Sequence, residues 1–153
     1  MSDPKNMETP AVTPYEEVIR EKGSLLFTPG GTSMMPLLSH HGNPVLLLPV
    51  TGRLKKGDVP FYKRANGQYV LHRVMRVRKD SYDMCGDNQV ILEKGVTDSM
   101  IFAVMDGFYK DGEYISVNTP WVRRYARRRI ASRLPRRIVL ALKRRAKRLF
   151  KKG

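Results

Sequence analysis

Acidic residues are missing from the last quarter of this sequence. No Asp or Glu follows Glu113, whereas 15 Lys and Arg residues lie between Arg123 and Lys152. The residues before Arg123 hold 14 acidic and 14 basic side chains, so the formal net charge of +15 belongs entirely to the C-terminal segment. A charge excess of this kind indicates a partner of negative charge.

Cysteine and long apolar runs are also scarce. The single cysteine, Cys85, excludes an intramolecular disulfide and favours a reducing compartment. The longest apolar run, Ile138 to Leu142, is far shorter than the ~20 residues that span a bilayer. Residues 1–23 lack the basic-then-apolar pattern of a secretory signal. We therefore expect a cytoplasmic protein with no transmembrane segment.

Turn residues divide the middle of the chain into short apolar segments. Strands are expected at 25–27, 45–50, 59–62, 69–77, 82–85, 101–105 and 114–117, with hairpin turns at Asn66-Gly67 and Asp111-Gly112. Many short strands with regular turns predict a mainly β fold, a small barrel or sandwich. A short helix is expected before them, with Thr13 as N-cap, Pro14 at the first helical position and Gly23 as the stop.

The sequence divides into three parts. Residues 1–12 are expected to be a disordered arm, residues 13–118 the β domain, and residues 119–153 a helical tail. In the tail, Pro135 is expected to separate two helices, 120–134 and 136–150.

The tail combines apolar stripes at helical spacing with faces that are almost entirely Arg and Lys. This pattern is typical of a helix that lies on an anionic membrane surface. The basic residues expected to contact that surface are Arg123, Arg124, Arg127, Arg128, Arg136, Arg137, Lys143 and Arg144. Two alternatives stay open: the stripes pack on the β domain or on a protein partner, or, less favoured, the basic residues bind nucleic-acid phosphates.

Four short motifs occur in order within the β domain. Ser33 lies in a glycine-rich turn (GGTSMMP, 30–36), and His72 lies in a strand segment (VLHRV, 70–74). The segment GDV (57–59) comes between them, and GDN (86–88) follows. A serine hydroxyl needs a base to act as a nucleophile, and histidine can take that proton and return it to a leaving amine. We therefore predict Ser33 as nucleophile and His72 as general base.

This series of motifs resembles the type I signal peptidases and their relatives, in particular the endoplasmic-reticulum and archaeal branch, which has His where bacterial members have Lys. The resemblance implies a signal peptidase/LexA-like fold and a serine endopeptidase that cleaves a leader or signal-like peptide from a precursor, without a cofactor. It also implies an acidic residue that orients His72. Asp87 matches the GDN motif, and Glu93 lies near the later spacing of the His branch, so both are candidates.

The residues around Ser33 are expected to form the oxyanion hole and the substrate cleft. These are Gly31, Thr32 and Met34, because small flexible residues beside a nucleophile let backbone N–H groups turn toward a developing oxyanion. Gly31 stands where the family usually has a serine. The family's N-terminal membrane anchor is not found here, and the basic tail could replace it by holding the protein on the inner face of the membrane.

Two other functions are compatible with the sequence. One is a self-cleaving, LexA-like regulator, although such proteins use Lys as base and carry a DNA-binding region before the protease domain. The other is a scaffold without catalysis that binds a membrane or nucleic acid through its tail.

Overall fold

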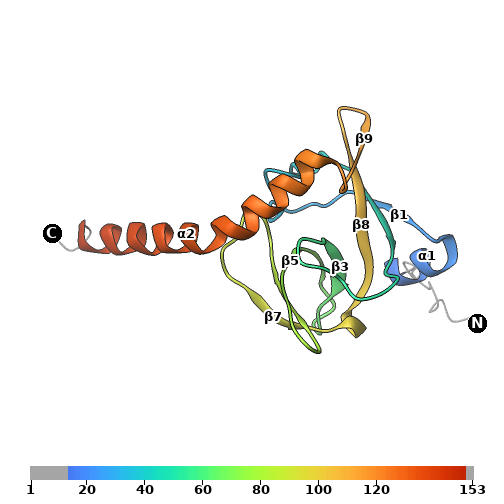
Figure 1. The fold of residues 1–153 in the computed structure, drawn as a ribbon, viewed down its shortest axis with the longest axis horizontal. Coiled ribbons are helices and arrows are strands. Elements are labelled where there is room, and N and C mark those ends of the chain that lie inside the picture. Colours follow the sequence, from blue (N-terminus) through green and yellow to red (C-terminus); the bar gives the residue numbers. More distant parts are fainter. Residues whose placement is uncertain (1–13, 151–153) are drawn as a thin grey trace, which may run out of the picture.

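The protein consists of two β-sheets with one helix at each end of the described chain (Figure 1). The computed structural model describes residues 14–150. The elements are α1 (Tyr15–Lys22), β1 (Leu25–Phe27), β2 (Val45–Pro49), β3 (Pro60–Lys63), β4 (Tyr69–Leu71), β5 (Arg73–Val77), β6 (Tyr82–Cys85), β7 (Glu93–Val96), a 3-10 turn (Asp98–Met100), β8 (Ile101–Lys110), β9 (Glu113–Ser116) and α2 (Pro120–Phe150). The predicted mainly β class, with a short N-terminal helix and a helical C-terminal segment, is confirmed.

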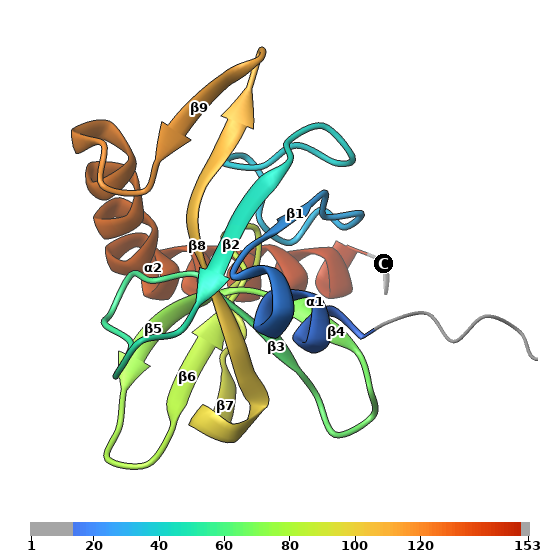
Figure 2. The ribbon, with the colours of Figure 1, turned by 90° about the vertical axis from the view of Figure 1, so that its right-hand side faces the viewer.

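Strand β8 organises the larger sheet. The strand order is β1-β2-β8-β3-β4, β9 also pairs with β8, and all of these pairs are antiparallel. The register shifts where β2 and β3 each pair with β8, and such bulges increase local twist. The smaller sheet has the order β5-β6-β7 and gathers at the lower end of β8 in Figure 2.

Strand β3 lies between two apolar cores because its alternate side chains point to opposite faces. Phe61 belongs to the first core, where its ring packs against those of Tyr15, Phe27, Tyr69 and Phe102. Tyr62 belongs to the second core, which the smaller sheet completes with Val74, Tyr82 and Met84.

The structure divides the expected strand 69–77 at His72. Residues before it form β4 in the larger sheet, and residues after it form β5 in the smaller sheet. His72 therefore lies where the chain passes from one sheet to the other. Strand β7 was not predicted, because its sequence EKGV lacks apolar alternation and it pairs only with β6.

The first helix ends where the sequence predicts. Gly23 follows α1 with a φ of 71°, a left-handed conformation that glycine adopts without steric cost. The predicted start is displaced by one residue, because Pro14 is the N-cap residue and Tyr15 is the first helical residue. Thr13 and the expected disordered arm lie outside the described residues.

The second helix is continuous, and the prediction of two helices was wrong. Helix α2 runs for 31 residues through Pro135, and Figure 1 shows its course bending part-way along. A proline in a helix interior removes one backbone hydrogen bond, and the helix can continue with a bend. The side chain of Val122, in the first turn of α2, is buried in the first core. Among residues 14–150, no helix combines the length and the apolar character needed to span a bilayer.

Candidate active site

Ser33 and His72 line the same cavity, which has a volume of about 300 Å³. Its other walls come from the turn that carries Ser33 and from the β3–β4 hairpin. Within residues 14–150, no hydrogen bond joins the Ser33 hydroxyl to the His72 ring. A nucleophile and its base are often this loosely aligned until substrate binds. The structure therefore places Ser33 and His72 at one site, but the hydrogen bond that would join them as a catalytic dyad is not formed within the described residues.

The GDN motif holds Ser33 in place through backbone contacts. The Asn88 N–H donates a hydrogen bond of 2.7 Å to the Ser33 carbonyl oxygen. Gly86 lies so close that a Cβ atom at this position would be 2.6 Å from the same oxygen. A glycine is therefore required at position 86, and the motif has a positioning role that its sequence alone does not reveal.

The His72 ring is buried against Tyr62 and Glu93. Its Nδ1 lies 3.4 Å from the Tyr62 hydroxyl oxygen and 3.8 Å from Glu93 Oε2. Tyr62 donates its only hydroxyl proton to Glu93 Oε2 at 2.6 Å. The Tyr62 oxygen can then interact with Nδ1 only as an acceptor, which assigns the His72 proton to Nδ1. In this tautomer Nε2 carries the lone pair, as a general base requires.

Arg64 fixes the Glu93 carboxylate. Its Nε donates to Oε1 at 2.7 Å and its Nη2 donates to Oε2 at 2.6 Å, a two-point contact that fixes both position and orientation. The hydrogen bonds from Arg64 hold the pKa of Glu93 below its ordinary value despite partial burial. The carboxylate behind His72 is therefore ionised at neutral pH.

Burial keeps His72 neutral. The side chain is only 5% exposed, and this desolvation lowers the pKa of the imidazole from its ordinary 6.5 to about 4. The negative charge of Glu93 opposes the shift, and the positive charge of Arg64 adds to it. The ring is thus unprotonated, and able to accept a proton, throughout the physiological pH range.

Asp87, the other candidate for orienting His72, is bound elsewhere. Its two carboxylate oxygens accept hydrogen bonds from Arg73 Nε and Nη2, each at 2.7 Å, and both side chains are almost completely buried. Arg73 also donates to the Gly57 carbonyl oxygen at 2.8 Å, which links the GDV motif to the same pair. Asp87 thus joins three of the four motifs, whereas Glu93 is the carboxylate next to His72.

The residues expected to form the oxyanion hole do not share one environment. Gly31 and the buried Met34 border the cavity, as expected. Thr32 is exposed and does not border it, and its carbonyl oxygen accepts a hydrogen bond from the Met35 N–H within the turn. The structure therefore places Gly31 and Met34, but not the Thr32 side chain, at the cleft.

Helix α2 contacts the loop that follows Gly86. Arg136 donates to the Asp87 carbonyl oxygen at 3.0 Å, Arg133 donates to the Val90 carbonyl oxygen at 3.0 Å, and Arg129 reaches Asp87 at 3.5 Å. The other basic residues predicted to contact a membrane are exposed: Arg123, Arg124, Arg127, Arg128, Arg137, Lys143 and Arg144. Arg136 thus belongs to the contact with the β domain.

Sequence reasoning missed Tyr62 and Arg64. A signal for Tyr62 was present in the Asn66-Gly67 hairpin, which sets the register of β3 against β4. That register pairs Tyr62 with Val70, two residues before His72, and places Arg64 at the end of the turn. In this register Tyr62 is the diagonal neighbour of His72 across the hairpin, whereas Arg64 reaches the site through its hydrogen bonds with Glu93, which the hairpin does not indicate.

The chain matches no protein-family model, no curated protein and no solved structure. The likeness to signal peptidases therefore rests on the four motifs and their order.

Replacing Gly86 by alanine should displace Ser33. The new Cβ would meet a backbone oxygen that cannot move away cheaply, so we expect G86A to lower the free energy of unfolding by about 1–3 kcal/mol. The control is G31A, where a Cβ would meet nothing within 4 Å and the change should stay within about 0.5 kcal/mol. Urea denaturation of both variants measures the difference, and equal stability would contradict the close packing.

The protonation of His72 should destabilise the fold in acid. Because its pKa falls from 6.5 to about 4 on folding, the stabilisation is complete above pH 6.5 and is lost as the pH falls to about 4. NMR titration of the ring should give a midpoint near pH 4. The variant H72Q should lack this part of the pH dependence of unfolding, worth on the order of 3 kcal/mol. A midpoint near 6.5 would show that the ring is not desolvated.

Proposed function

We propose that this protein is a serine endopeptidase with a signal peptidase/LexA-like fold, which cleaves a leader or signal-like peptide from a precursor. One observation carries the proposal. Ser33 and a buried, neutral His72 line a single cavity, and an ionised carboxylate lies behind the histidine. This is the set of groups that acyl transfer to a serine requires.

The proposed reaction has two halves. In the first, His72 Nε2 takes the Ser33 hydroxyl proton as the serine oxygen attacks the scissile carbonyl carbon. The tetrahedral intermediate then collapses, the proton passes from His72 to the leaving amine, and an acyl-enzyme remains. In the second half, His72 takes a proton from water, the resulting hydroxide attacks the ester, and the proton returns to Ser33.

Tyr62 and Glu93 support the charged intermediate of this cycle. When His72 accepts a proton it becomes an imidazolium, and its Nδ1–H faces the Tyr62 oxygen and the Glu93 carboxylate. The negative charge of Glu93 stabilises this cation, as the direction of its effect on the pKa of His72 indicates. Arg64 holds the carboxylate still, so the stabilisation requires no rearrangement during the reaction.

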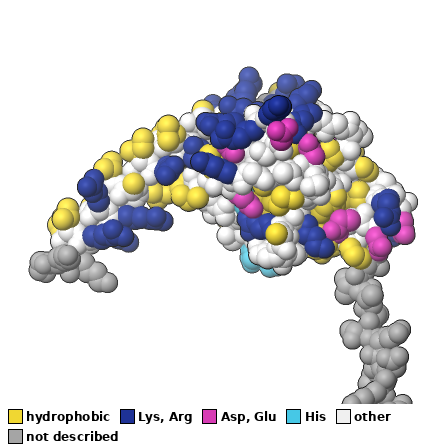
Figure 3. Space-filling view, turned by 90° about the horizontal axis from the view of Figure 1, so that it is seen from below, with side chains coloured by type: hydrophobic (Ala, Val, Ile, Leu, Met, Phe, Trp, Pro, Cys, Tyr) yellow, Lys and Arg dark blue, Asp and Glu magenta, His cyan; other side chains and the backbone are white. Residues whose placement is uncertain are grey.

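We further propose that the exposed part of α2 holds the enzyme on an anionic membrane surface at the inner face of the membrane. Every residue of α2 beyond Arg136 is exposed, including large apolar side chains such as Leu142, Leu149 and Phe150. Figure 3 shows this arm projecting from the body with apolar and basic side chains interspersed along it. Exposed apolar side chains on a basic helix suit an interface between anionic headgroups and acyl chains.

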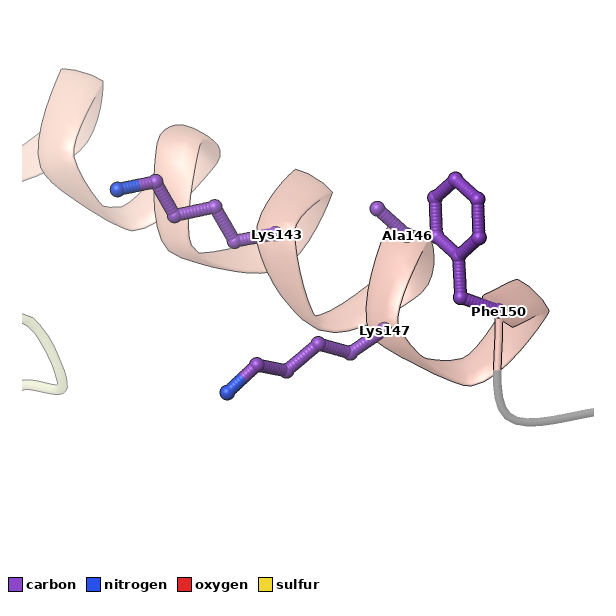
Figure 4. Close-up of a pocket in the computed structure, with 4 residues that line it drawn as sticks. All are labelled: Lys143, Ala146, Lys147 and Phe150. Carbon is purple, nitrogen blue, oxygen red and sulfur yellow. The ribbon is translucent and has the colours of Figure 1, made fainter.

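The end of the arm is consistent with this role. A shallow hollow there is lined by Lys143, Ala146, Lys147 and Phe150, all from one helix (Figure 4). The two lysine side chains extend back along the helix, away from the Phe150 ring. An apolar ring on a helix that also carries basic side chains suits a surface on which acyl chains and headgroups lie close together.

The arm also lies close to the candidate site. A second hollow of about 620 Å³ is lined by His72, Arg64 and Glu93 on one side and by Leu140 and Arg144 of α2 on the other. A precursor lying at the membrane surface could therefore reach the base along the arm.

Cleavage should depend on Ser33. The test presents a proteome-derived peptide library to the full-length protein with vesicles of phosphatidylglycerol and phosphatidylcholine, and identifies new termini by mass spectrometry. S33A and H72Q should each reduce cleavage by about 10⁴-fold or more, because nucleophile and base act as a unit. S99A, at an exposed serine, should cleave as the wild type does. Equal cleavage by wild type and S33A would contradict Ser33 as the nucleophile, and the absence of cleavage by the wild type would leave a non-catalytic scaffold as the explanation.

Membrane binding should depend on the apolar face of the arm. We expect the wild type to sediment with phosphatidylglycerol-containing vesicles and L142N/L149N to bind at least about tenfold more weakly, because two leucines no longer enter the interface. L26N changes a leucine that is equally exposed but lies on β1, and should bind as the wild type does. Sedimentation with duplex DNA but not with the vesicles would contradict the membrane proposal.

A further inference from the structure

A second large cavity lies between the first half of α2 and the segment that leads into β3. Its volume is about 560 Å³, and residues 53–59 form one wall and residues 117–130 the other. We propose that this cavity binds a phosphate group, either free in solution or carried by a lipid headgroup. The inference is independent of the peptidase activity proposed above.

The cavity is built on fixed contacts with the β domain. The Gly57 N–H donates to the Val74 carbonyl oxygen at 2.9 Å, and the Val74 N–H donates to the Asp58 backbone carbonyl oxygen at 2.8 Å. Ile130 of α2 would lie 3.9 Å from a Cβ at Gly57, so the helix and the loop are close neighbours. Val122 anchors the helix in the core beneath. These contacts hold the loop and the helix beside one another, so basic side chains of both walls border one cavity.

The lining has a strong excess of positive charge. Six basic side chains border the cavity, Arg53, Lys55, Lys56, Arg73, Arg123 and Arg127, against one carboxylate, Asp58. Two of the six are neutralised, because Arg53 pairs with Asp98 at 2.6 Å and Arg73 pairs with Asp87. Asp58 is also engaged, since its carboxylate accepts the Lys55 backbone N–H at 2.7 Å.

Four cations are thus left without a carboxylate partner in the part of the chain that the structure describes: Lys55, Lys56, Arg123 and Arg127. Like charges around one concavity repel one another, and an anion between them relieves that repulsion. They come from both walls, so a single ligand can contact the loop and the helix together.

A phosphate matches this charge better than a carboxylate does. It carries up to two negative charges and several acceptor oxygens, which can bind lysine ammonium and arginine guanidinium groups at the same time. The volume is within the range of small-molecule sites and leaves room for a substituent on the phosphate. The site is also distinct from the peptidase cleft: His72 lines that cleft, and the next residue, Arg73, lines this cavity.

The test measures binding of two probes to the full-length protein by titration calorimetry at constant ionic strength. The probes are inorganic pyrophosphate and dihexanoyl phosphatidic acid below its micelle concentration. The variant K55Q/K56Q should weaken binding about tenfold or more, because two charge-assisted contacts are lost. The matched control K22Q/K110Q removes the same charge from exposed lysines that do not border the cavity and should bind as the wild type does.

Each outcome decides the proposal. Binding of either probe supports the proposal if K55Q/K56Q loses it and K22Q/K110Q retains it. Binding of pyrophosphate would indicate a free phosphate, and binding of phosphatidic acid alone would indicate a headgroup. Equal loss in both double variants would show diffuse charge attraction and overturn it, as would the absence of binding to either probe. S33A should bind both probes normally, so failure of the peptidase proposal would leave this one intact.

Discussion

The buried ion pair between Arg73 and Asp87 is the interaction on which the site depends. Arg73 follows His72 directly, and Asp87 lies between Gly86 and Asn88, the two residues that hold the Ser33 backbone. One pair therefore fixes the base relative to the nucleophile, although the two come from different parts of the chain. Removing one partner of such a pair typically costs about 3–5 kcal/mol, because it leaves an uncompensated charge in the interior. A competing arrangement of the loop would have to separate the pair, so the fold favours one geometry.

Helix α2 extends this framework. Its arginines donate to backbone carbonyl oxygens of the loop after Gly86, so the helix supports the same loop that holds the Ser33 backbone. The basic tail thus contains two kinds of positive charge. Arg129, Arg133 and Arg136 satisfy backbone acceptors of the body, whereas the residues after Arg136 face solvent. The apolar residues divide in the same way, with Val122 in the core and Phe150 exposed. The composition of the segment is uniform, but its contacts with the body divide it into two parts with different environments.

The strands and turns could be predicted from the sequence because they depend on local chemistry. Features that depend on contacts between distant parts of the chain could not. Turns such as Asn66-Gly67 could be located because glycine there adopts a positive φ at no steric cost. The break at His72 could not be predicted, because β4 and β5 have the same local conformation and differ only in which sheet they join. The common cavity of Ser33 and His72 followed from the motif order. The choice between Asp87 and Glu93 did not, since it depends on which arginine each carboxylate meets across the fold.

The separation of charge along the chain has a consequence for how the molecule moves. The part before Arg123 is formally neutral and the whole excess of +15 lies in the tail, much of it on an arm that projects from the body (Figure 3). Such a distribution is a large electric dipole, and in the field of a negatively charged surface it experiences a torque as well as an attraction. Near such a surface the molecule would be turned before contact, so that the arm would meet the surface first. Orientation by the field reduces the fraction of unproductive encounters, and dissolved salt weakens it over the Debye length of about 8–10 Å.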